Sequence, residues 1–294
     1  MNEWNIMNIP VNFTLCEAQP FVKWVGGKRG LLSQIFEHID TNFNNYYEPF
    51  VGGGALFFEL LNRGLLLDKE VYLFDVNTEL INAYNVVKNK PTELIENLEI
   101  FKLKHSKDFY YEIRAWDRET DFLDKSDVLR ATRFIYLNKT CFNGLYRVNK
   151  KNQNNVPMGD YKNPKIYDEK VILNSSKALQ NVTILNSSYK EVLNYAEKDD
   201  LVYFDPPYYP LTKTANFTSY NEFDFLDKEQ VELYEVIKEL SDKKCQVLHS
   251  NSSTDFIKDL YKDFQIEEIK ANRFINSKGD SRGKILEVLI KGNL

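Results

Sequence analysis

The residues best suited to chemistry form the tetrapeptide Asp205-Pro206-Pro207-Tyr208, which directly follows the apolar run 201–204. Two consecutive prolines fix φ and remove two backbone donors, so this segment offers carbonyl oxygens and a carboxylate at the end of an expected strand. A planar exocyclic amino group fits such a site, because one of its protons can bond Asp205 and the other the Pro206 carbonyl. The ring of Tyr208 can lie against the base that carries this amino group. A proline-rich turn after a buried strand is the alternative interpretation of the tetrapeptide.

A glycine turn, Gly52-Gly53-Gly54, follows a second expected strand and opens an expected helix. Bare backbone and a helix N-terminus let the polar end of a ligand approach closely. Asp75 ends the next expected strand, about twenty residues further on, which is the spacing at which an acidic residue meets ribose hydroxyls in dinucleotide-binding folds. The triplet is not the GxGxxG motif, which counts against NAD. We therefore predict a nucleoside-type cofactor, with a close structural turn as the alternative.

Two other segments are rich in cations. The segment 21–29 places Trp24 among cations and glycines before a helix, a composition that suits a charged ligand beside an indole; a basic helix entry with Trp24 in the core is the alternative. The segment 139–165 has Asp160 as its single acidic residue, and it can face phosphates or form a solvated loop. Its basic residues are Lys139, Arg147, Lys150, Lys151, Lys162 and Lys165.

Composition narrows the class of protein. The chain has 294 residues and 43% hydrophobic content, which allows one large domain or a core domain with a smaller one. Its net charge of −5 argues against a protein coated in positive charge. No stretch has the length of a membrane span and the N-terminus lacks signal-peptide features, so we expect a cytoplasmic protein. Cys16, Cys141 and Cys245 are far apart and lack histidines at metal-ligand spacing, so we expect free thiols and no metal site.

The elements that must position these residues alternate between strand and helix at both ends of the chain. Expected strands are 48–51, 71–74, 182–185, 201–204, 246–250 and 285–290, and expected helices are 31–39, 56–61, 78–87, 227–240 and 254–262. Successive βα units predict a parallel sheet. Between them, 91–137 has a charged helical pattern, and 138–165 has the composition of an ordered binding loop or hairpin. We predict an α/β fold in which a doubly wound, Rossmann-like sheet (1–88 and 171–294) is interrupted by an inserted helical and hairpin module (89–170).

Four motifs, taken in order, resemble the Dam family of DNA N6-adenine methyltransferases, nearest to the Dpn-type GATC methylases of type II restriction-modification systems. They are KWVGGK (23–28), EPFVGGGA (48–55), FNGLYR (142–147) with NVP (155–157), and DPPY (205–208). The resemblance spans about 20 to 290 and does not cover 1–19. Phe142 stands where several relatives have tyrosine, and Val25 where many have alanine or threonine.

The resemblance implies a methyltransferase sheet, a cofactor, a DNA substrate and a set of site residues. S-adenosylmethionine would be bound by Trp24, Lys28, Phe50, Gly52, Gly53, Gly54, Asp75 and Asp205, and catalysis would rest on Asp205, Pro206, Pro207 and Tyr208. The module 89–170 would recognise double-stranded DNA through Lys23, Phe142, Asn143, Leu145, Arg147 and Pro157. Phe142 and Asn143 would wedge into or support the opened duplex, while the others would read the bases of GATC. A restriction endonuclease encoded nearby, not a stable subunit, is the implied protein partner.

The implied reaction is direct transfer of a sulfonium methyl group to adenine N6, after the base has left the stack. Hydrogen bonds to Asp205 and the Pro206 carbonyl would favour a tetrahedral, nucleophilic nitrogen. No cysteine lies in the motif, so no covalent enzyme intermediate is expected. Two other classes stay open: a related amino-methyltransferase acting on another DNA site, on cytosine N4, on RNA or on a protein amide, and a DNA-binding module without catalysis. The aspartate at the first motif position favours adenine, since relatives more commonly have serine for cytosine N4 and asparagine for protein amides.

Overall fold

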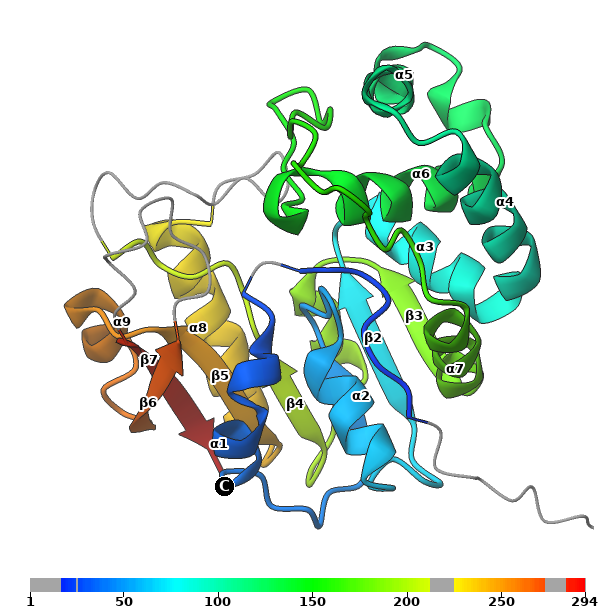
Figure 1. Ribbon diagram of the computed structural model, residues 1–294. Helices are drawn as coiled ribbons and strands as arrows, with labels where there is room; N and C mark the ends of the chain where they lie inside the picture. The colour runs from blue at the N-terminus through cyan, green and yellow to red at the C-terminus, as the bar shows by residue number, and fades with distance from the viewer. Residues whose placement is uncertain (1–16, 25, 212–224, 273–283, 294) are drawn as a thin grey trace, which may run out of the picture.

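The computed structural model describes residues 17–24, 26–211, 225–272 and 284–293. In these residues the chain forms a seven-stranded sheet of order β3-β2-β1-β4-β5-β7-β6 (Figure 1). The strands are β1 (Tyr46–Glu48), β2 (Val71–Asp75), β3 (Val182–Asn186), β4 (Leu201–Phe204), β5 (Gln246–Ser252), β6 (Gln265–Asn272) and β7 (Lys284–Gly292). Strands β1 to β5 are parallel, and β7 runs antiparallel to both β5 and β6. The predicted doubly wound sheet is confirmed.

The central strands are buried on both faces, as their continuous apolar runs require. Along β4, Leu201 and Tyr203 face one hydrophobic cluster, while Val202 and Phe204 face another. The first cluster is covered by α1 (Leu32–Phe36), α2 (Ala55–Asn62), α3 (Thr78–Asn89) and α7 (Glu169–Leu179), and the second by α8 (Asp227–Asp242) and α9 (Asp255–Leu260) (Figure 1). Alternation along each strand therefore places helices on both sides of the sheet.

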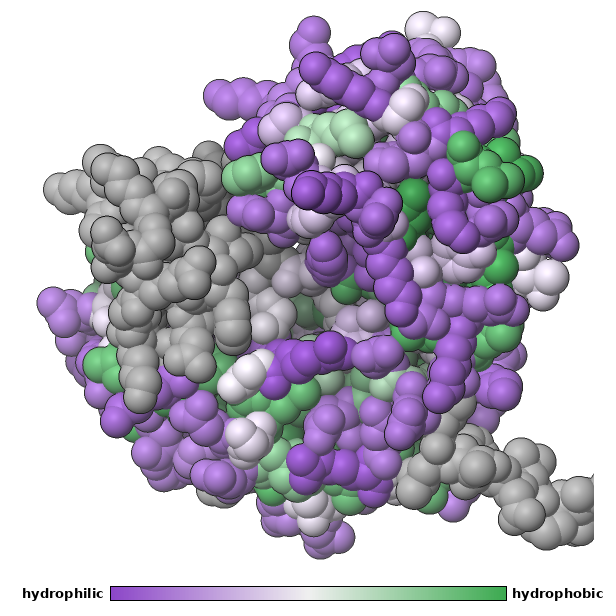
Figure 2. All heavy atoms as spheres, in the orientation of Figure 1, coloured by the Kyte–Doolittle hydropathy of each residue, from purple (hydrophilic) through white to green (hydrophobic). Residues whose placement is uncertain are grey.

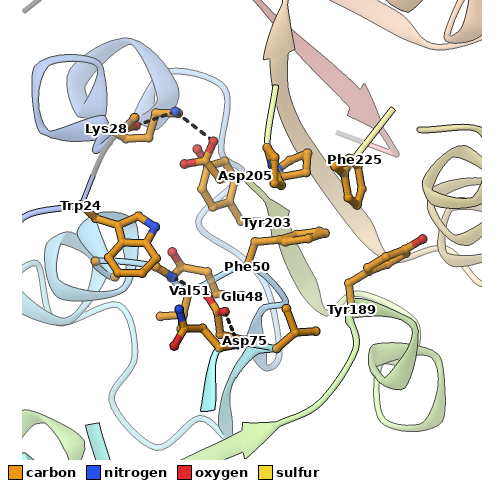
Figure 3. Close-up of a pocket in the computed structure, with 18 of the residues that line it drawn as sticks. Trp24, Lys28, Glu48, Phe50, Val51, Asp75, Tyr189, Tyr203, Asp205 and Phe225 are labelled. Atoms are coloured by element: carbon orange, nitrogen blue, oxygen red, sulfur yellow. Dashed lines mark hydrogen bonds and ion pairs between the residues drawn. The ribbon is translucent and has the colours of Figure 1, made fainter. Parts of the chain in front are cut away.

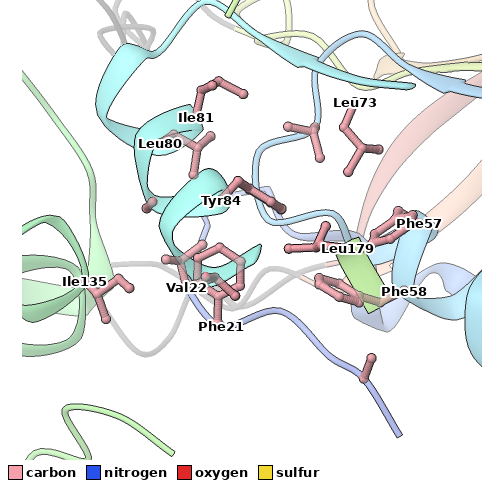
Figure 4. Packing of buried hydrophobic residues seen from close by; sticks show 14 of the residues in the cluster. Phe21, Val22, Phe57, Phe58, Leu73, Leu80, Ile81, Tyr84, Ile135 and Leu179 are labelled. Carbon is pink, nitrogen blue, oxygen red and sulfur yellow. The ribbon is translucent and has the colours of Figure 1, made fainter. Parts of the chain in front are cut away.

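Three further helices, α4 (Pro91–Leu103), α5 (Lys107–Ala115) and α6 (Asp127–Thr140), follow α3 and confirm the helical pattern expected there. Helix α6 packs against α3 and α4, and its Ile135 belongs to the same core cluster as the sheet. The segment before the first glycines joins this core, because Phe21 meets Tyr84 edge-on with 4.8 Å between ring centroids (Figure 4). The helical region and the sheet thus share one hydrophobic core.

After α6 the chain forms an irregular hairpin in place of a regular sheet. A short 3-10 turn, Phe142–Gly144, follows the helix, and isolated bridges pair Cys141 with Met158 and Val148 with Asn154. The backbone N–H of Phe142 donates to the Pro157 carbonyl at 2.9 Å, which ties the two arms together. The ordered loop or hairpin predicted for this segment is confirmed.

Three elements differ from the sequence prediction. The first strand spans Tyr46–Glu48 in place of 48–51, because Pro49 has no N–H for a ladder and the chain turns there. Strand β6 was not predicted, since its charged residues mask the alternation that an edge strand shows. Helix α7 was not named; it begins after Asp168, whose side chain accepts from the Val171 N–H as an N-cap.

Within the described ranges, no helix has both the length and the apolar character needed to cross a membrane. The same residues contain no group of three or more histidine, cysteine or acidic side chains placed to hold a metal ion. Cys141 and Cys245 are buried free thiols, and Cys16 lies outside the described residues.

Candidate active site

A cavity of about 440 Å³ opens at the carboxyl ends of β1, β2 and β4. Strands β1 and β4 are neighbours, although the chain leaves β1 towards β2 on one side and reaches β4 only after β3. This is the switch point of the sheet, where open α/β folds bind their ligands. Figure 2 shows this face of the molecule hollowed between the helical region above and the strand ends below, with mainly hydrophilic residues around the hollow.

The predicted catalytic and cofactor residues converge on this cavity. It is lined by Trp24, Lys28, Phe50, Gly52, Gly53, Gly54, Asp75, Asp205, Pro206, Pro207 and Tyr208, among others. They come from four separate stretches of sequence, and each stretch lies at the carboxyl end of a strand or in the segment that crosses over those ends (Figure 3). The structure therefore brings together every residue of these two predicted sets.

The acceptor end of the cavity is built around Asp205. Lys28 is buried, with 4% of its side chain exposed, and its Nζ lies 2.9 Å from Asp205 Oδ1 and donates to the Gly26 carbonyl at 2.8 Å. The same ammonium stands 4.6 Å from the centroid of the Tyr208 ring. This ion pair fixes the carboxylate through Oδ1, which is itself buried, while the Asp205 side chain as a whole keeps 20% of its surface exposed. The carboxylate can therefore still accept a hydrogen bond from a ligand N–H.

Burial raises the pKa of Asp205 to about 6; the Lys28 ammonium opposes this rise, and the Glu287 carboxylate adds to it. The carboxyl group is thus poised to be ionised near neutral pH without being strongly held in that state. Tyr208 donates its hydroxyl proton to Glu287 Oε2 at 2.7 Å, which fixes the ring beside Asp205. Glu287 lies on β7, and the sequence analysis did not single it out.

The glycine turn is shaped by Trp24 and Asp75. Gly52 has φ +46°, and a Cβ there would stand 2.6 Å from the Trp24 indole, so only glycine fits beneath this ring. The Gly52 N–H donates to Asp75 Oδ2 at 3.2 Å, and the Asn77 N–H donates to Oδ1 at 2.9 Å. Burial raises the pKa of Asp75 to about 6, while these backbone donors lower it. Asp75 therefore holds the turn and also lines the cavity where a ribose was expected.

An aromatic group forms the opposite end of the cavity (Figure 3). Phe50 stacks on Tyr189 with 5.2 Å between ring centroids, and Phe225 meets Phe50 edge-on at 5.8 Å. Such rings suit a flat heterocycle. Only Phe50 was predicted. Tyr189 comes shortly after β3. It could have been predicted in the same way as Asp75, because both residues lie near the end of a parallel strand. No sequence signal marks Phe225.

Glu48 also lines the cavity, at the end of β1, and was not predicted. It is 3% exposed, and its Oε2 accepts a hydrogen bond from the Tyr46 hydroxyl at 2.9 Å. Burial raises its pKa to about 8, with the Tyr46 hydrogen bond lowering it and Asp205 raising it. The carboxyl group of Glu48 is therefore protonated at neutral pH and adds no charge to the acceptor end.

The predicted DNA-contact residues gather beside the cavity in the hairpin and the segment before it. Phe142 is 49% exposed at the base of the hairpin, next to the Cys141–Met158 bridge, and Asn143 follows it with φ +55°. The exposed Lys23 is held by its backbone, whose N–H and C=O both bond the Asn138 amide at 2.7 Å. Its side chain packs on Gly144, where a Cβ would lie 2.5 Å from it.

The remaining predicted contacts lie on the two arms of this hairpin. Arg147 donates from Nε to Asn155 Oδ1 at 2.6 Å, which orients its guanidinium. Pro157 is exposed, whereas Leu145 is half-buried and packs on the core. Tyr146, which lies between Leu145 and Arg147 in the sequence, stacks on Trp24 with 5.7 Å between ring centroids. The sequence analysis did not predict it as a site residue. Trp24 therefore contacts the hairpin and the cavity at once.

The residues present fit S-adenosylmethionine. A cavity of about 440 Å³ lies within the size range of cofactor sites. Its aromatic end can stack on the adenine, and the Asp75 carboxylate can bond the ribose hydroxyls. The ion pair of Lys28 with Asp205 lies at the end of the cavity that would hold the charged methionine part of the cofactor. The Asp205 carboxylate lies at the same end of the cavity, so the methyl donor and an acceptor amine can meet there.

The sheet order and this cavity define an α/β methyltransferase that uses S-adenosylmethionine. Residues 24–275 match the family of D12 class N6 adenine-specific DNA methyltransferases, and the chain belongs to that family. It is therefore an adenine-specific DNA methyltransferase, and the resemblance to the Dam family is confirmed.

Three curated relatives cover nearly all of the chain. Type II methyltransferase M.MjaIII of Methanocaldococcus jannaschii is 46% identical over an alignment of 288 residues, and this alignment covers 93% of this chain and 99% of the relative. Type II methyltransferase M1.LlaDCHI of Lactococcus lactis subsp. cremoris is 44% identical over 274 residues, 92% of this chain and 94% of the relative. The DNA adenine methylase of Escherichia coli (strain K12) is 35% identical over 272 residues, 92% and 93% of the two chains.

Proposed function

We propose that the enzyme methylates N6 of adenine within double-stranded GATC, and that the target base is flipped into the cavity. The observation that carries this proposal is that Lys23 meets the hairpin that holds the other proposed DNA contacts. Lys23 is far from Phe142 and Arg147 in sequence, yet its side chain packs on Gly144 between them, and Trp24 beside it stacks on Tyr146 and lines the cavity. DNA held by this surface would therefore have its bases next to the acceptor end.

Catalysis is proposed to rest on Asp205, Pro206 and Tyr208. Bound S-adenosylmethionine supplies an electrophilic methyl group on its sulfonium. The Asp205 carboxylate and the Pro206 carbonyl accept hydrogen bonds from the two N6 hydrogens, which stabilises the positive charge that develops on nitrogen until one of the two protons is released. Tyr208, held by Glu287, lies against the face of the flipped base. Pro207 is proposed to keep the carboxylate and carbonyl in one rigid arrangement.

DNA recognition is proposed to belong to the module 89–170 with Lys23. Phe142 is exposed and apolar at the base of the hairpin, where its N–H bonds the Pro157 carbonyl, and this suits it to replace the flipped base in the stack, with Asn143 beside it. Arg147 keeps donors beyond its bond to Asn155 for guanine O6 and N7. Pro157 and Leu145 would add apolar contacts to bases, and Lys23 would bond the outer guanine.

The biological setting is proposed to be a restriction system in the cytoplasm, with the endonuclease encoded nearby. Support comes from two relatives, which are named type II methyltransferases. A solitary methylase is the competing setting, since another relative is named a DNA adenine methylase. The genes beside this one distinguish the two settings.

The test uses purified protein, labelled S-adenosylmethionine and two duplexes that differ only in whether the central A·T of a single GATC is intact or scrambled. We expect N6-methyladenine in the intact duplex alone. Label in both duplexes contradicts the GATC assignment and leaves the chemistry standing. Label on cytosine, or on RNA in place of duplex DNA, supports the related amino-methyltransferase.

The role of Asp205 is tested by Asp205→Ala. Methyl transfer should be abolished while the circular dichroism spectrum stays unchanged, because the acceptor carboxylate is lost and the fold does not depend on it. An exposed carboxylate in the hairpin region, Asp160, offers the control variant Asp160→Ala. Near-normal turnover by Asp205→Ala contradicts the proposed mechanism.

A further inference from the structure

Behind the acceptor segment, α8 and β5 bring together polar side chains that the mechanism has not used. Gln230 and Asn251 have no exposed surface, and Ser252 is 4% exposed. Burying such groups is costly unless each finds hydrogen-bond partners. Their partners include the backbone of the segment that follows Asp205.

The hydrogen bonds form a chain that ends on this backbone. Gln230 donates from Nε2 to the Pro207 carbonyl at 3.2 Å, and its Oε1 accepts from Asn251 Nδ2 at 3.0 Å. The Tyr209 N–H donates to Asn251 Oδ1 at 3.1 Å, and Ser252 Oγ donates to the Tyr209 carbonyl at 2.7 Å. The backbone is therefore held from one side at Pro207 and Tyr209.

We call these hydrogen bonds of Gln230, Asn251 and Ser252 with the backbone of Pro207 and Tyr209 the clamp. The two prolines explain why the segment needs it. Neither Pro206 nor Pro207 has an N–H, so hydrogen bonds can fix their peptide planes only through the carbonyls. Gln230 occupies the carbonyl of Pro207. Among the described residues, no donor bonds the Pro206 carbonyl, and the Asp205 side chain is paired with Lys28 but stays 20% exposed. The clamp thus occupies the Pro207 carbonyl and leaves the Pro206 carbonyl and the exposed part of the carboxylate to a target amino group.

We propose that Gln230, held in place by Asn251, is a positioning residue for methyl transfer: by binding the Pro207 carbonyl it aims the Asp205 and Pro206 acceptors at the target nitrogen. This inference rests on the acceptor roles proposed above. Gln230 does not contact the substrate. Its amide acts through the backbone, and its loss lets the acceptor carbonyl rotate away from the line of transfer.

The test compares Gln230→Met with Gln246→Met. Gln246 is also buried and lies on β5, but at the opposite end, where its Nε2 donates to the Asn42 carbonyl at 3.3 Å, far from the cavity. Both variants remove a buried amide and keep a similar volume, but Gln230→Met breaks two hydrogen bonds and Gln246→Met one, so Gln230→Met should lose more thermal stability and the rates are compared below both unfolding transitions. We expect the single-turnover rate on GATC duplex to fall about 10- to 100-fold for Gln230→Met, as small misplacements at a reacting centre do. Gln246→Met should keep the wild-type rate.

The affinity for S-adenosylmethionine, measured without DNA, should change less than about twofold in Gln230→Met, since the loss falls on the transition state. A variant that keeps a donor, Gln230→Glu, should recover the rate at pH 6 relative to wild type at the same pH, because a protonated carboxyl can bond the carbonyl. If Gln230→Met loses no more rate than Gln246→Met, or if Gln230→Glu is as slow as Gln230→Met at both pH 6 and pH 8, the inference is wrong. Asp205→Ala is measured alongside: activity in that variant overturns the acceptor assignment itself, whereas an inactive Asp205→Ala leaves it standing and isolates the role of Gln230.

Discussion

The acceptor carboxylate should cost the folded protein stability, and removing its charge should recover that stability. Burial raises the pKa of Asp205 from 3.8 to about 6, and its side chain is 20% exposed. The folded state binds this proton more tightly than the unfolded state, so this carboxyl group lowers stability as pH rises from about 4 to 6. The rise corresponds to about 3 kcal/mol at neutral pH, at about 1.4 kcal/mol per pKa unit.

Asp205→Asn keeps the shape and stays neutral, so it should be more stable than wild type by up to about 3 kcal/mol at pH 7.5, or about 5 °C in thermal midpoint. Urea unfolding followed by circular dichroism measures the difference, which should shrink as the pH is lowered towards 4, where both side chains are uncharged. Asp160→Asn, at an exposed site, should show no gain. A variant no more stable than wild type at pH 7.5, or a gain that persists unchanged at pH 4, would refute the reasoning.

Three further outcomes follow from the geometry. Gly52→Ala should weaken S-adenosylmethionine binding at least tenfold in calorimetry, because its Cβ would displace the Trp24 indole; unchanged affinity would contradict this packing. Tyr146→Ala should weaken cofactor binding about fivefold, although Tyr146 does not line the cavity, because aromatic stacking of about 1 kcal/mol holds Trp24; an effect on DNA binding alone would count against it. Phe142→Ala should reduce the fluorescence rise of 2-aminopurine placed at the target adenine, while Phe142→Tyr should preserve it; equal signals from both would remove Phe142 from base extrusion.

The sequence could predict the cavity because its lining follows a local rule. In a parallel sheet, the residues just past each strand share one edge. Gly52, Asp75 and Asp205 each stand just past an apolar run that reads as a strand, so their meeting point could be predicted before the strand order was known. The error in the bounds of β1 did not affect the prediction of the cavity, because the glycine turn after this strand is recognised from its residue type.

Other site residues could not be predicted, because their roles come from distant contacts. Glu287 meets Tyr208 only because β7 returns antiparallel beside β5, an order that nothing in the local pattern of 284–292 reveals. Gln230 reads as one more polar position of an amphipathic helix, and the structure alone shows it buried against the Pro207 carbonyl. A buried polar residue cannot be recognised from the local sequence, because its hydrogen-bond partners come from distant parts of the chain.

The proposed DNA contact Lys23 stands next to Trp24 of the cavity, so the two proposed sites share one segment of chain. Lys23 is fixed by the Asn138 amide of α6 and packs on Gly144, while Trp24 covers the glycine turn and stacks on Tyr146. A cofactor that restrains Trp24 would therefore also restrain the hairpin proposed to meet DNA. Because linkage is reciprocal, DNA that restrains the hairpin would then raise cofactor affinity by the same factor. The Trp24 and Tyr146 stack is the physical contact through which the two ligands would do so.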